Sequence, residues 1–357
     1  MEAQEILQDV VFVLLYGGLM GVSVAAALYL LLRRGNAIAP EVKSPVRLRR
    51  WSAAFLLASA LSHVFWVFCA LHPTPAVYSI VCGLDMLMLF PTITGVLVSM
   101  LQDRHRPVWP VLVALVPALV LVVLCVIRGD EALYLPLSIY VIALYALILL
   151  YMVFAVRNYG RWLRDNYADL ENKEVWQSLI ILGLFLLLFV MYSSTPAGGP
   201  VLVYLLQIDY IIIVALLLWR VETLPQLSEI SSPEAEESPA ISSKMDALLK
   251  KNCEDKQLYL QNDLTLAQLA NAIGTNRTYL SYHFSQLGIT YNAYINGLRI
   301  RHFIGLYEKA MADGRAVTAQ QLSSESGYRS YSTFSAAFKQ HTGKTVTAWM
   351  QDKSFHI

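Results

Sequence analysis

The sequence has few charged residues for its length. Only 15% of its 357 residues are Asp, Glu, Lys or Arg, whereas a soluble protein usually has about 25%. The deficit is local, because the long apolar runs lie within residues 1–220 and residues 221–357 have an ordinary soluble composition. The first part of the chain is therefore skewed toward lipid, and the whole chain has room for two or three domains.

Cysteine is scarce, and several catalytic motifs are missing. The four cysteines have no spacing typical of a disulfide framework or a zinc site. Residues 1–220 contain no His–Glu metalloprotease motif and no Gly-rich nucleotide loop. Their last apolar run has no Lys that would form a retinal Schiff base. We therefore expect no enzymatic activity, no catalytic residues, no bound metal and no cofactor.

Residues 1–220 contain seven apolar stretches, each close to the ~20 residues that a helix needs to cross a bilayer. We predict an all-α chain whose first domain is a seven-helix transmembrane bundle. Tryptophans lie at the ends of several stretches, as interfacial aromatic residues do. The stretches are Val10–Leu32, Trp51–Leu71, Val77–Leu101, Val108–Ile127, Leu133–Val156, Trp176–Ser194 and Val201–Trp219.

Positive charge is confined to alternate loops between these stretches. One set of loops carries 12 Lys and Arg residues, and the other set carries only Arg128. The positive-inside rule places the rich set in the cytoplasm. The N-terminus is then outside, and after seven spans the tail that starts at Arg220 is inside.

Three ionisable residues inside the apolar stretches are candidates for a sensing site. His63 shares a helical face with Ser59, Asp85 belongs to a polar series at seven-residue spacing, and Asp209 lies in the middle of the last stretch. Such residues are costly in a bilayer, so they would line a cavity for a ligand, proton or ion. The alternative, that they form buried hydrogen bonds between helices, remains open.

Residues 221–243 have the composition of a disordered linker. The segment from Val221 to Ser243 contains five Glu, three Pro and no Lys or Arg, and such a chain cannot bury enough apolar surface to order itself. We expect an acidic spacer that stands off from lipid headgroups and from DNA.

Residues 264–286 predict a helix-turn-helix motif. Thr265 is a candidate N-cap for a helix whose buried stripe begins at Leu266. Gly274 follows as the turn, and a second helix is expected over Arg277–Gln286. The surrounding segment from residue 244 onward has 13 Lys plus Arg and 8 Asp plus Glu, a net charge of +5, as a nucleic-acid surface would.

The same pattern recurs over residues 318–340, with Gly327 as the turn, 53 positions after Gly274, and a second helix over Tyr331–Gln340. A long amphipathic helix, Tyr291–Ala310, is predicted to connect the two motifs. The expected core residues of the motifs are Leu269, Leu280, Phe284, Leu322, Phe334 and Phe338, and those of the connecting helix are Tyr294, Leu298, Phe303 and Leu306.

Together, these stretches resemble the AraC-type DNA-binding domain. The matching segments read LTLAQLANAIGTNRTYLSYHF, LGITYNAYINGLRI and LSSESGYRSYSTFSAAFKQHTGKTVTAW. The resemblance covers residues 244–357, close to a third of the chain, and it is specific because two motifs and their connecting helix occur at the right spacing. It implies two recognition helices that enter successive major-groove segments on one face of DNA.

The resemblance also implies which side chains face DNA. Ala336 departs from the family, where a longer polar side chain is common at this position, and neither recognition helix offers an Arg fork for guanine. The groove-facing candidates are Thr278, Ser281, Tyr282 and Ser285 in the first recognition helix and Tyr331, Ser332, Thr333 and Ala336 in the second. The phosphate-contacting candidates are Arg277, Arg329, Ser330 and Lys339.

A membrane domain followed by a DNA-binding domain predicts a one-component transcription regulator. It would be a multi-pass protein of the bacterial inner membrane, with its C-terminal domain in the cytoplasm. Its partners would be double-stranded DNA, the lipid bilayer and an unidentified signal or small ligand, with a homodimer left open. Two alternatives remain: a transporter or enzyme with an appended regulatory domain, and a helix-turn-helix domain that binds protein.

Overall fold

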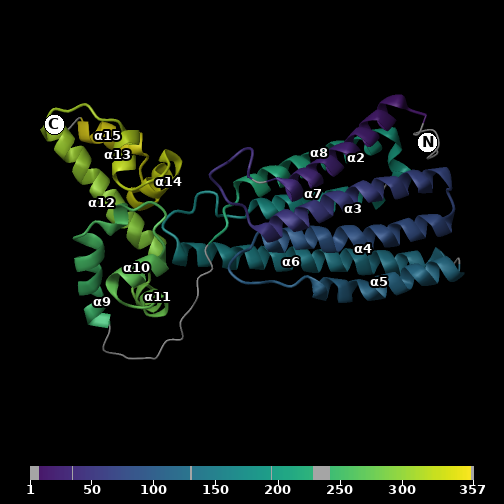
Figure 1. Cartoon of the computed structure of the whole chain (residues 1–357), viewed down its shortest axis with the longest axis horizontal. Helices are drawn as coiled ribbons and strands as arrows, with labels where there is room; N and C mark the ends of the chain where they lie inside the picture. Colours follow the sequence, from purple (N-terminus) through teal and green to yellow (C-terminus); the bar gives the residue numbers. More distant parts are fainter. Residues whose placement is uncertain (1–7, 34, 129–130, 194, 228–241, 355–357) are drawn as a thin grey trace. The chain divides into compact units, whose positions relative to one another are not determined.

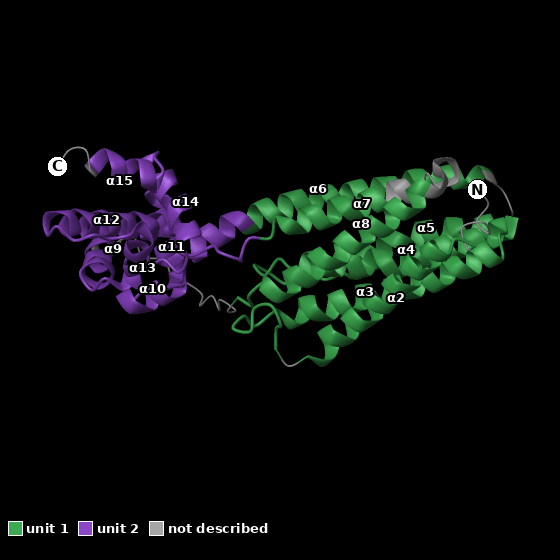
Figure 2. Cartoon of the chain, turned by 90° about the horizontal axis from the view of Figure 1, so that it is seen from above, with its two compact units in different colours: residues 1–159, 175–227 green, residues 160–174, 228–357 purple. Residues whose placement is uncertain are grey.

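The computed structural model describes residues 8–33, 35–128, 131–193, 195–227 and 242–354. The chain forms two compact units (Figure 2). Unit 1 contains Met1–Tyr159 and Val175–Leu227, and unit 2 contains Gly160–Glu174 and Ser228–Ile357. The sequence does not anticipate this division, because a short segment from the apolar two-thirds belongs to the C-terminal unit.

Unit 1 is a bundle of long apolar helices (Figure 1). Among the described residues, six helices are long and apolar enough to cross a membrane. The sixth predicted span, Trp176–Ser194, corresponds to α7, which has only 17 residues and falls short of that length. The helices are α2 (Val10–Leu32), α3 (Val46–Leu71), α4 (Pro75–Ser99), α5 (Trp109–Arg128), α6 (Tyr134–Asn166), α7 (Gln177–Ser193) and α8 (Thr195–Thr223).

Local sequence explains where some of these helices begin and how two of them pack. The Asp9 side chain accepts hydrogen bonds from two backbone N–H groups of the first turn of α2, and Thr74 caps α4 in the same way. Trp51 packs its ring on Gly95, where a Cβ atom would lie 2.3 Å from the ring. Gly95 thus lets α3 and α4 approach closely.

The predicted linker begins later than expected. Helix α8 continues to Thr223, and the next residues fold back onto unit 1. The backbone N–H of Gln226 donates to the Lys43 carbonyl at 2.7 Å, and that of Leu227 donates to the Gln102 side chain at 2.9 Å. Residues 221–227 are therefore an ordered part of unit 1. Residues 228–241 of the predicted linker lie outside the described residues.

Unit 2 consists of short helices arranged around one long helix. The predicted all-α fold is confirmed over the described residues, where the only β-type pairing is an isolated bridge between Tyr167 and Thr265. The helices are α9 (Ser242–Leu249), α10 (Leu266–Ile273), α11 (Arg277–Gln286), α12 (Tyr291–Ala312), α13 (Ala319–Glu325), α14 (Tyr331–Thr342) and α15 (Val346–Ser354).

Helix α12 is shared by two separate hydrophobic cores, one beneath each helix-turn-helix motif. All six core residues predicted for the motifs are buried. On α12 the prediction is right for Leu298 and Phe303 but wrong for Tyr294 and Leu306, which are only half-buried. The Tyr294 hydroxyl donates to Glu254 at 3.0 Å, which keeps its ring at the rim. The first core takes Tyr291, Ile295 and Leu298 from α12, and the second takes Ile300, Phe303 and Tyr307.

Candidate nucleic-acid interface

The first helix-turn-helix motif is fixed by its caps and by one glycine. Thr265 and Gln268 form a reciprocal capping box at the start of α10, which satisfies two backbone donors. Gly274 ends α10 with φ of +76°, a backbone conformation that favours glycine. Asn276 then caps α11 by accepting a hydrogen bond from the Tyr279 backbone N–H at 2.9 Å. The first recognition helix therefore begins at Arg277, as predicted.

Helix α11 directs its predicted groove-facing residues away from the core. Tyr282 has 63% of its surface exposed, and Thr278 and Ser285 are also exposed. Ser281 is half-buried, while Leu280 and Phe284 on the opposite face are buried in the first core. The exposed face therefore offers one long side chain that carries both a ring and a hydroxyl.

The second motif has the same construction with tighter packing at its turn. Gly327 has φ of +85°, and a Cβ atom there would lie 2.7 Å from the Leu260 backbone, so only glycine fits. Ser330 caps α14 through the Thr333 backbone N–H. Tyr331 and Ala336 are exposed, as is Ser332, whereas Thr333 is half-buried.

The candidate phosphate-contacting residues are in different situations. Lys339 is exposed in the last turn of α14. Arg329 is exposed and lies 3.4 Å from the carboxylate of Asp263. Arg277 is half-buried, and its Nε donates to Asn166 at 2.7 Å. Burial lowers the pKa of Arg277, and the Tyr167 phenol opposes this shift. The Ser330 hydroxyl is already used as the cap of α14.

Sequence reasoning missed Arg299, whose guanidinium is 1% exposed at the middle of α12. Its Nε donates to the Tyr259 carbonyl at 2.7 Å and its Nη2 to the Gln261 carbonyl at 2.9 Å. Its guanidinium also lies over the Tyr328 ring, 5.3 Å from the centroid, at the turn of the second motif. Burial lowers the pKa of Arg299, and nearby groups that include Asp169 oppose this shift. Arg299 therefore links the two halves of unit 2.

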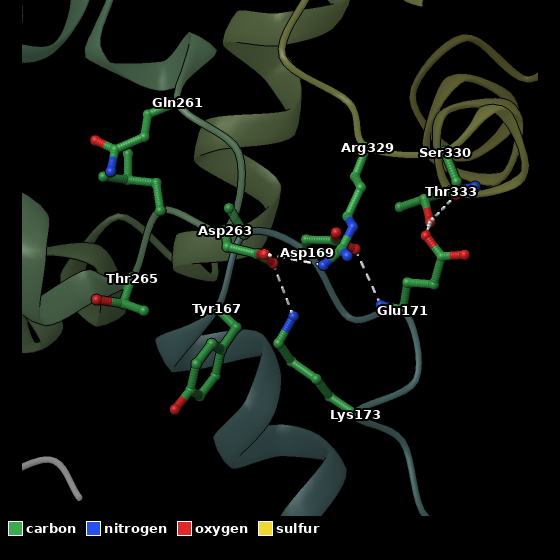
Figure 3. A network of polar contacts seen from close by, with 12 residues as sticks. Tyr167, Asp169, Glu171, Lys173, Gln261, Asp263, Thr265, Arg329, Ser330 and Thr333 are labelled. Carbon is green, nitrogen blue, oxygen red and sulfur yellow. Dashed lines mark hydrogen bonds and ion pairs between the residues drawn. The ribbon is translucent and has the colours of Figure 1, made fainter. Parts of the chain in front are cut away.

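A second feature that the sequence did not predict is the packing of residues 165–174, the α6–α7 segment, within unit 2 (Figure 3). The Ala168 backbone N–H donates to the Leu264 carbonyl at 3.2 Å, and the Ala168 side chain is buried in the first core. Asn292 on α12 donates to the Ala168 carbonyl at 2.6 Å. Lys173 lies 3.1 Å from Asp263. These contacts join residues that are about a hundred positions apart, so local pattern gives no signal for them.

The candidate sensing residues of unit 1 lie in contacts between helices. The His63 Nδ1 lies 2.7 Å from the Ser59 carbonyl. The ring of His63 lies between those of Tyr16 on α2 and Tyr210 on α8, with centroid distances of 4.5 and 5.2 Å. Asp85 accepts a hydrogen bond from the Trp66 indole at 2.6 Å. These contacts agree with the helix-packing alternative and do not by themselves show a ligand site.

Asp209, the third candidate, has one carboxylate oxygen without a hydrogen-bond partner in the described part of the chain, as Asp85 has at its Oδ1. It is 6% exposed on α8, and its Oδ2 has no hydrogen-bond partner among the described residues. The neighbouring Gln207 is buried as well, and its Oε1 is also without a partner there. Two unsatisfied polar groups close together on one helix are unusual, because buried polar groups are nearly always hydrogen-bonded.

Comparison with known proteins places the double motif in a known type of domain. Residues 269–352 match the family model described as a helix-turn-helix domain. The C-terminal part of the chain is a helix-turn-helix domain. The match runs from α10 into α15 and includes both recognition helices. Such a domain is a DNA-binding module and not a catalytic one. A search of curated proteins and a search of solved structures found no match to the chain.

Proposed function

We propose that the protein is a membrane-bound, AraC-type one-component transcription regulator that binds promoter DNA sequence-specifically. The observation that carries this proposal is the pairing of two helix-turn-helix motifs on one shared helix, α12, in a chain whose other unit has six membrane-length helices. Both recognition helices have an exposed face with polar side chains and a buried face in a core. Because α12 packs against both motifs, it would hold the two recognition helices at a fixed spacing, and they could then enter successive segments of the major groove.

The membrane topology that we propose has seven spans, with α7 as a short one. Helix α7 would be roughly 25 Å long at 1.5 Å per residue, which is near the lower limit for crossing. The shared packing of residues 160–174 and 242–354 in unit 2 supports this count. Segments that share a core lie on the same side of a membrane, so α7 and α8 either both cross or both do not, and their apolar composition favours crossing by both. The loop charges place that side in the cytoplasm of a bacterial cell.

Reporter fusions test this topology. An export-dependent enzyme fused after Arg128 should be active, and the same enzyme fused after Lys173 should be inactive. The opposite pattern would reverse the orientation and place the helix-turn-helix domain away from DNA.

Unit 1 is proposed to sense the signal through the ionisable residues that its helices bury. His63 on α3 contacts aromatic rings of α2 and α8, so a change in the position or charge of His63 would alter the packing of all three helices. His63→Ala and Asp209→Asn should abolish the response of a target promoter in cells. If both variants also lose DNA binding as purified proteins, their role is structural and the sensing proposal fails.

The DNA-binding proposal is tested by DNA capture with the full chain in lipid nanodiscs. Sheared genomic DNA of the source cell would be captured at two salt concentrations and sequenced. Enriched sites whose retention falls with salt are expected, because neutralising phosphates releases counterions. The matched control is the chain with Tyr282→Ala and Lys339→Ala, which changes exposed side chains and leaves both cores intact.

Lys339 alone gives a quantitative form of this test. Because its side chain is exposed at the end of α14, Lys339→Ala should weaken binding to all duplexes about equally and lower the salt slope by about 1. An unchanged slope would mean that α14 does not approach the phosphate backbone. Salt-independent retention by the unchanged chain would instead favour the alternative that the domain binds protein.

A further inference from the structure

The α6–α7 segment contacts the N-terminal turns of both recognition helices. Asn166 accepts a hydrogen bond at 2.7 Å from Arg277, the first residue of α11. Glu171 accepts one at 3.3 Å from the Thr333 hydroxyl in the first turn of α14 (Figure 3). Recognition helices contact base edges mainly through their N-terminal residues. One short stretch of chain thus lies against the part of each helix that DNA would need.

The segment is acidic where it meets these helices. Residues 165–174 contain four acidic residues and one Lys, a net charge of −3. The Glu171 carboxylate lies at the start of α14, where unpaired backbone N–H groups and the helix dipole favour an anion. A phosphate of bound DNA would be favoured at the same place for the same reason.

Two ion pairs that share one carboxylate connect the segment to the turn of the second motif. Lys173 contacts one carboxylate oxygen of Asp263, and Arg329 contacts the other at 3.4 Å (Figure 3). Asp263 is therefore shared between the segment and a candidate phosphate-contacting residue. An exposed ion pair of this kind is weak, so a DNA phosphate would compete directly with Asp263 for Arg329.

We propose that the face of unit 2 formed by Arg277, Thr333 and Asp263 is a binding surface for the chain's own α6–α7 segment, and that this segment and DNA compete for it. The proposal rests on the proposed function. The Glu171 carboxylate would occupy the place of a DNA phosphate, and DNA would bind once the contacts of Glu171 and Lys173 open, while Ala168 stays in the first core. Both ends of the segment continue into apolar helices, α6 and α7. A signal that moves either helix would therefore reach the segment through the chain itself.

The first test weakens the segment without changing the DNA face. Glu171→Ala removes the contact with Thr333, and Glu174→Ala is the matched control, because it makes the same charge change in the same segment at an exposed residue. With the full chain in nanodiscs and a duplex selected by genomic capture, Glu171→Ala should tighten binding roughly threefold to tenfold, as expected for loss of one hydrogen bond of ordinary strength. Glu174→Ala should have a smaller effect.

The second test measures docking directly. A zero-length carbodiimide cross-link should form between Lys173 and Asp263, whose side-chain atoms are 3.1 Å apart, and mass spectrometry would quantify it. Addition of the duplex should lower its yield. Lys173→Arg keeps the charge but cannot form the cross-link, which identifies the product.

The outcomes separate the two proposals. Tighter binding by Glu171→Ala together with loss of the cross-link on adding DNA supports competition. Equal, salt-sensitive binding by all variants with an unchanged cross-link overturns competition and leaves the DNA-binding function intact. Absence of DNA binding by every variant, with the cross-link still formed, overturns the DNA-binding function and competition with it.

Discussion

The two helix-turn-helix halves of unit 2 have the same construction but expose different side chains. The first recognition helix, α11, offers Tyr282 with 63% of its surface exposed. The second, α14, offers Tyr331 with 38% of its surface exposed and the methyl group of Ala336, with Thr333 half-buried. Both halves therefore expose a tyrosine, but α11 exposes it more fully, and Ala336 can offer only an apolar contact to a thymine methyl. We therefore expect the first half to contribute more to sequence discrimination than the second.

The halves also differ in how they are held together inside. The second core is dominated by aromatic rings in tilted and edge-to-face contact, with Phe303 4.6 Å from Phe334 and 5.6 Å from Phe338 between centroids. The first core is mainly aliphatic and includes Ala168 from the α6–α7 segment. The first half therefore depends for part of its core on a segment from the apolar part of the chain, and the second half does not.

The largest expected effect comes from opening one core at a time. Phe334→Ala should lower the stability of the second half by about 3–5 kcal/mol, because the ring is fully buried among other rings. Hydrogen exchange of the full chain in nanodiscs should show faster exchange in α13 to α15. Leu280→Ala should act in the same way on α10 and α11. If either variant raised the hydrogen-exchange rates of both halves equally, the interpretation of two separate cores would be contradicted.

Arg299 is the residue whose loss should affect both halves at once. Arg299→Met leaves two carbonyls without their donor and should cost about 2 kcal/mol, as expected when buried acceptors lose their hydrogen bonds. Exchange should then rise on both sides of α12. Arg301→Met on the same helix is the control, because its side chain is exposed and the expected change is within about 0.5 kcal/mol. A response limited to one half would show that Arg299 does not link them.

A smaller effect, on the preference for one DNA sequence over another, should distinguish the exposed faces of α11 and α14. Tyr282→Ala should change the ratio of affinities for a captured site and a site with one altered base pair by about tenfold, the size of one specific contact. Ser332→Ala, at an exposed position of α14, should change that ratio less than about threefold. Fluorescence anisotropy with labelled duplexes gives both ratios. A larger change for Ser332→Ala would reverse the assignment of the halves.

The smallest expected effect concerns the caps. Thr265 takes part in a reciprocal capping box with Gln268. Thr318 accepts only from the Gln321 backbone, and the Gln321 side chain donates to Glu325 instead. Thr265→Ala should therefore cost about 1 kcal/mol and Thr318→Ala about half as much. Local exchange rates in α10 and α13 measure this difference, and an equal loss would mean that the reciprocal bond adds nothing.

Much of unit 2 could be predicted from the sequence because its signals are local. A cap, a buried stripe and a turn glycine lie within about ten residues of one another in each motif. Helix α11 spans Arg277–Gln286, the range predicted from the sequence. The match of residues 269–352 to a helix-turn-helix domain agrees with that reading.

What the sequence did not reveal depends on contacts between distant residues. Glu171 and Thr333 are 162 positions apart, and no periodicity relates them. From the sequence, Arg299 is expected to be exposed on an amphipathic helix. In the structure it donates hydrogen bonds to the carbonyls of residues 259 and 261, which lie far from it in the sequence. In unit 1 the apolar stretches were found from composition, but α8 spans Thr195–Thr223 and so extends beyond the predicted stretch at both ends.

The central claim is that the C-terminal unit reads DNA. The most direct measurement compares the affinity of the full chain in nanodiscs for a captured fragment and for a scrambled fragment of equal length, across a range of salt concentrations. We predict tighter binding to the captured fragment at every concentration and a linear fall of log affinity with log salt for both fragments. Equal affinities for the two fragments, or affinities that do not change with salt, would contradict the claim.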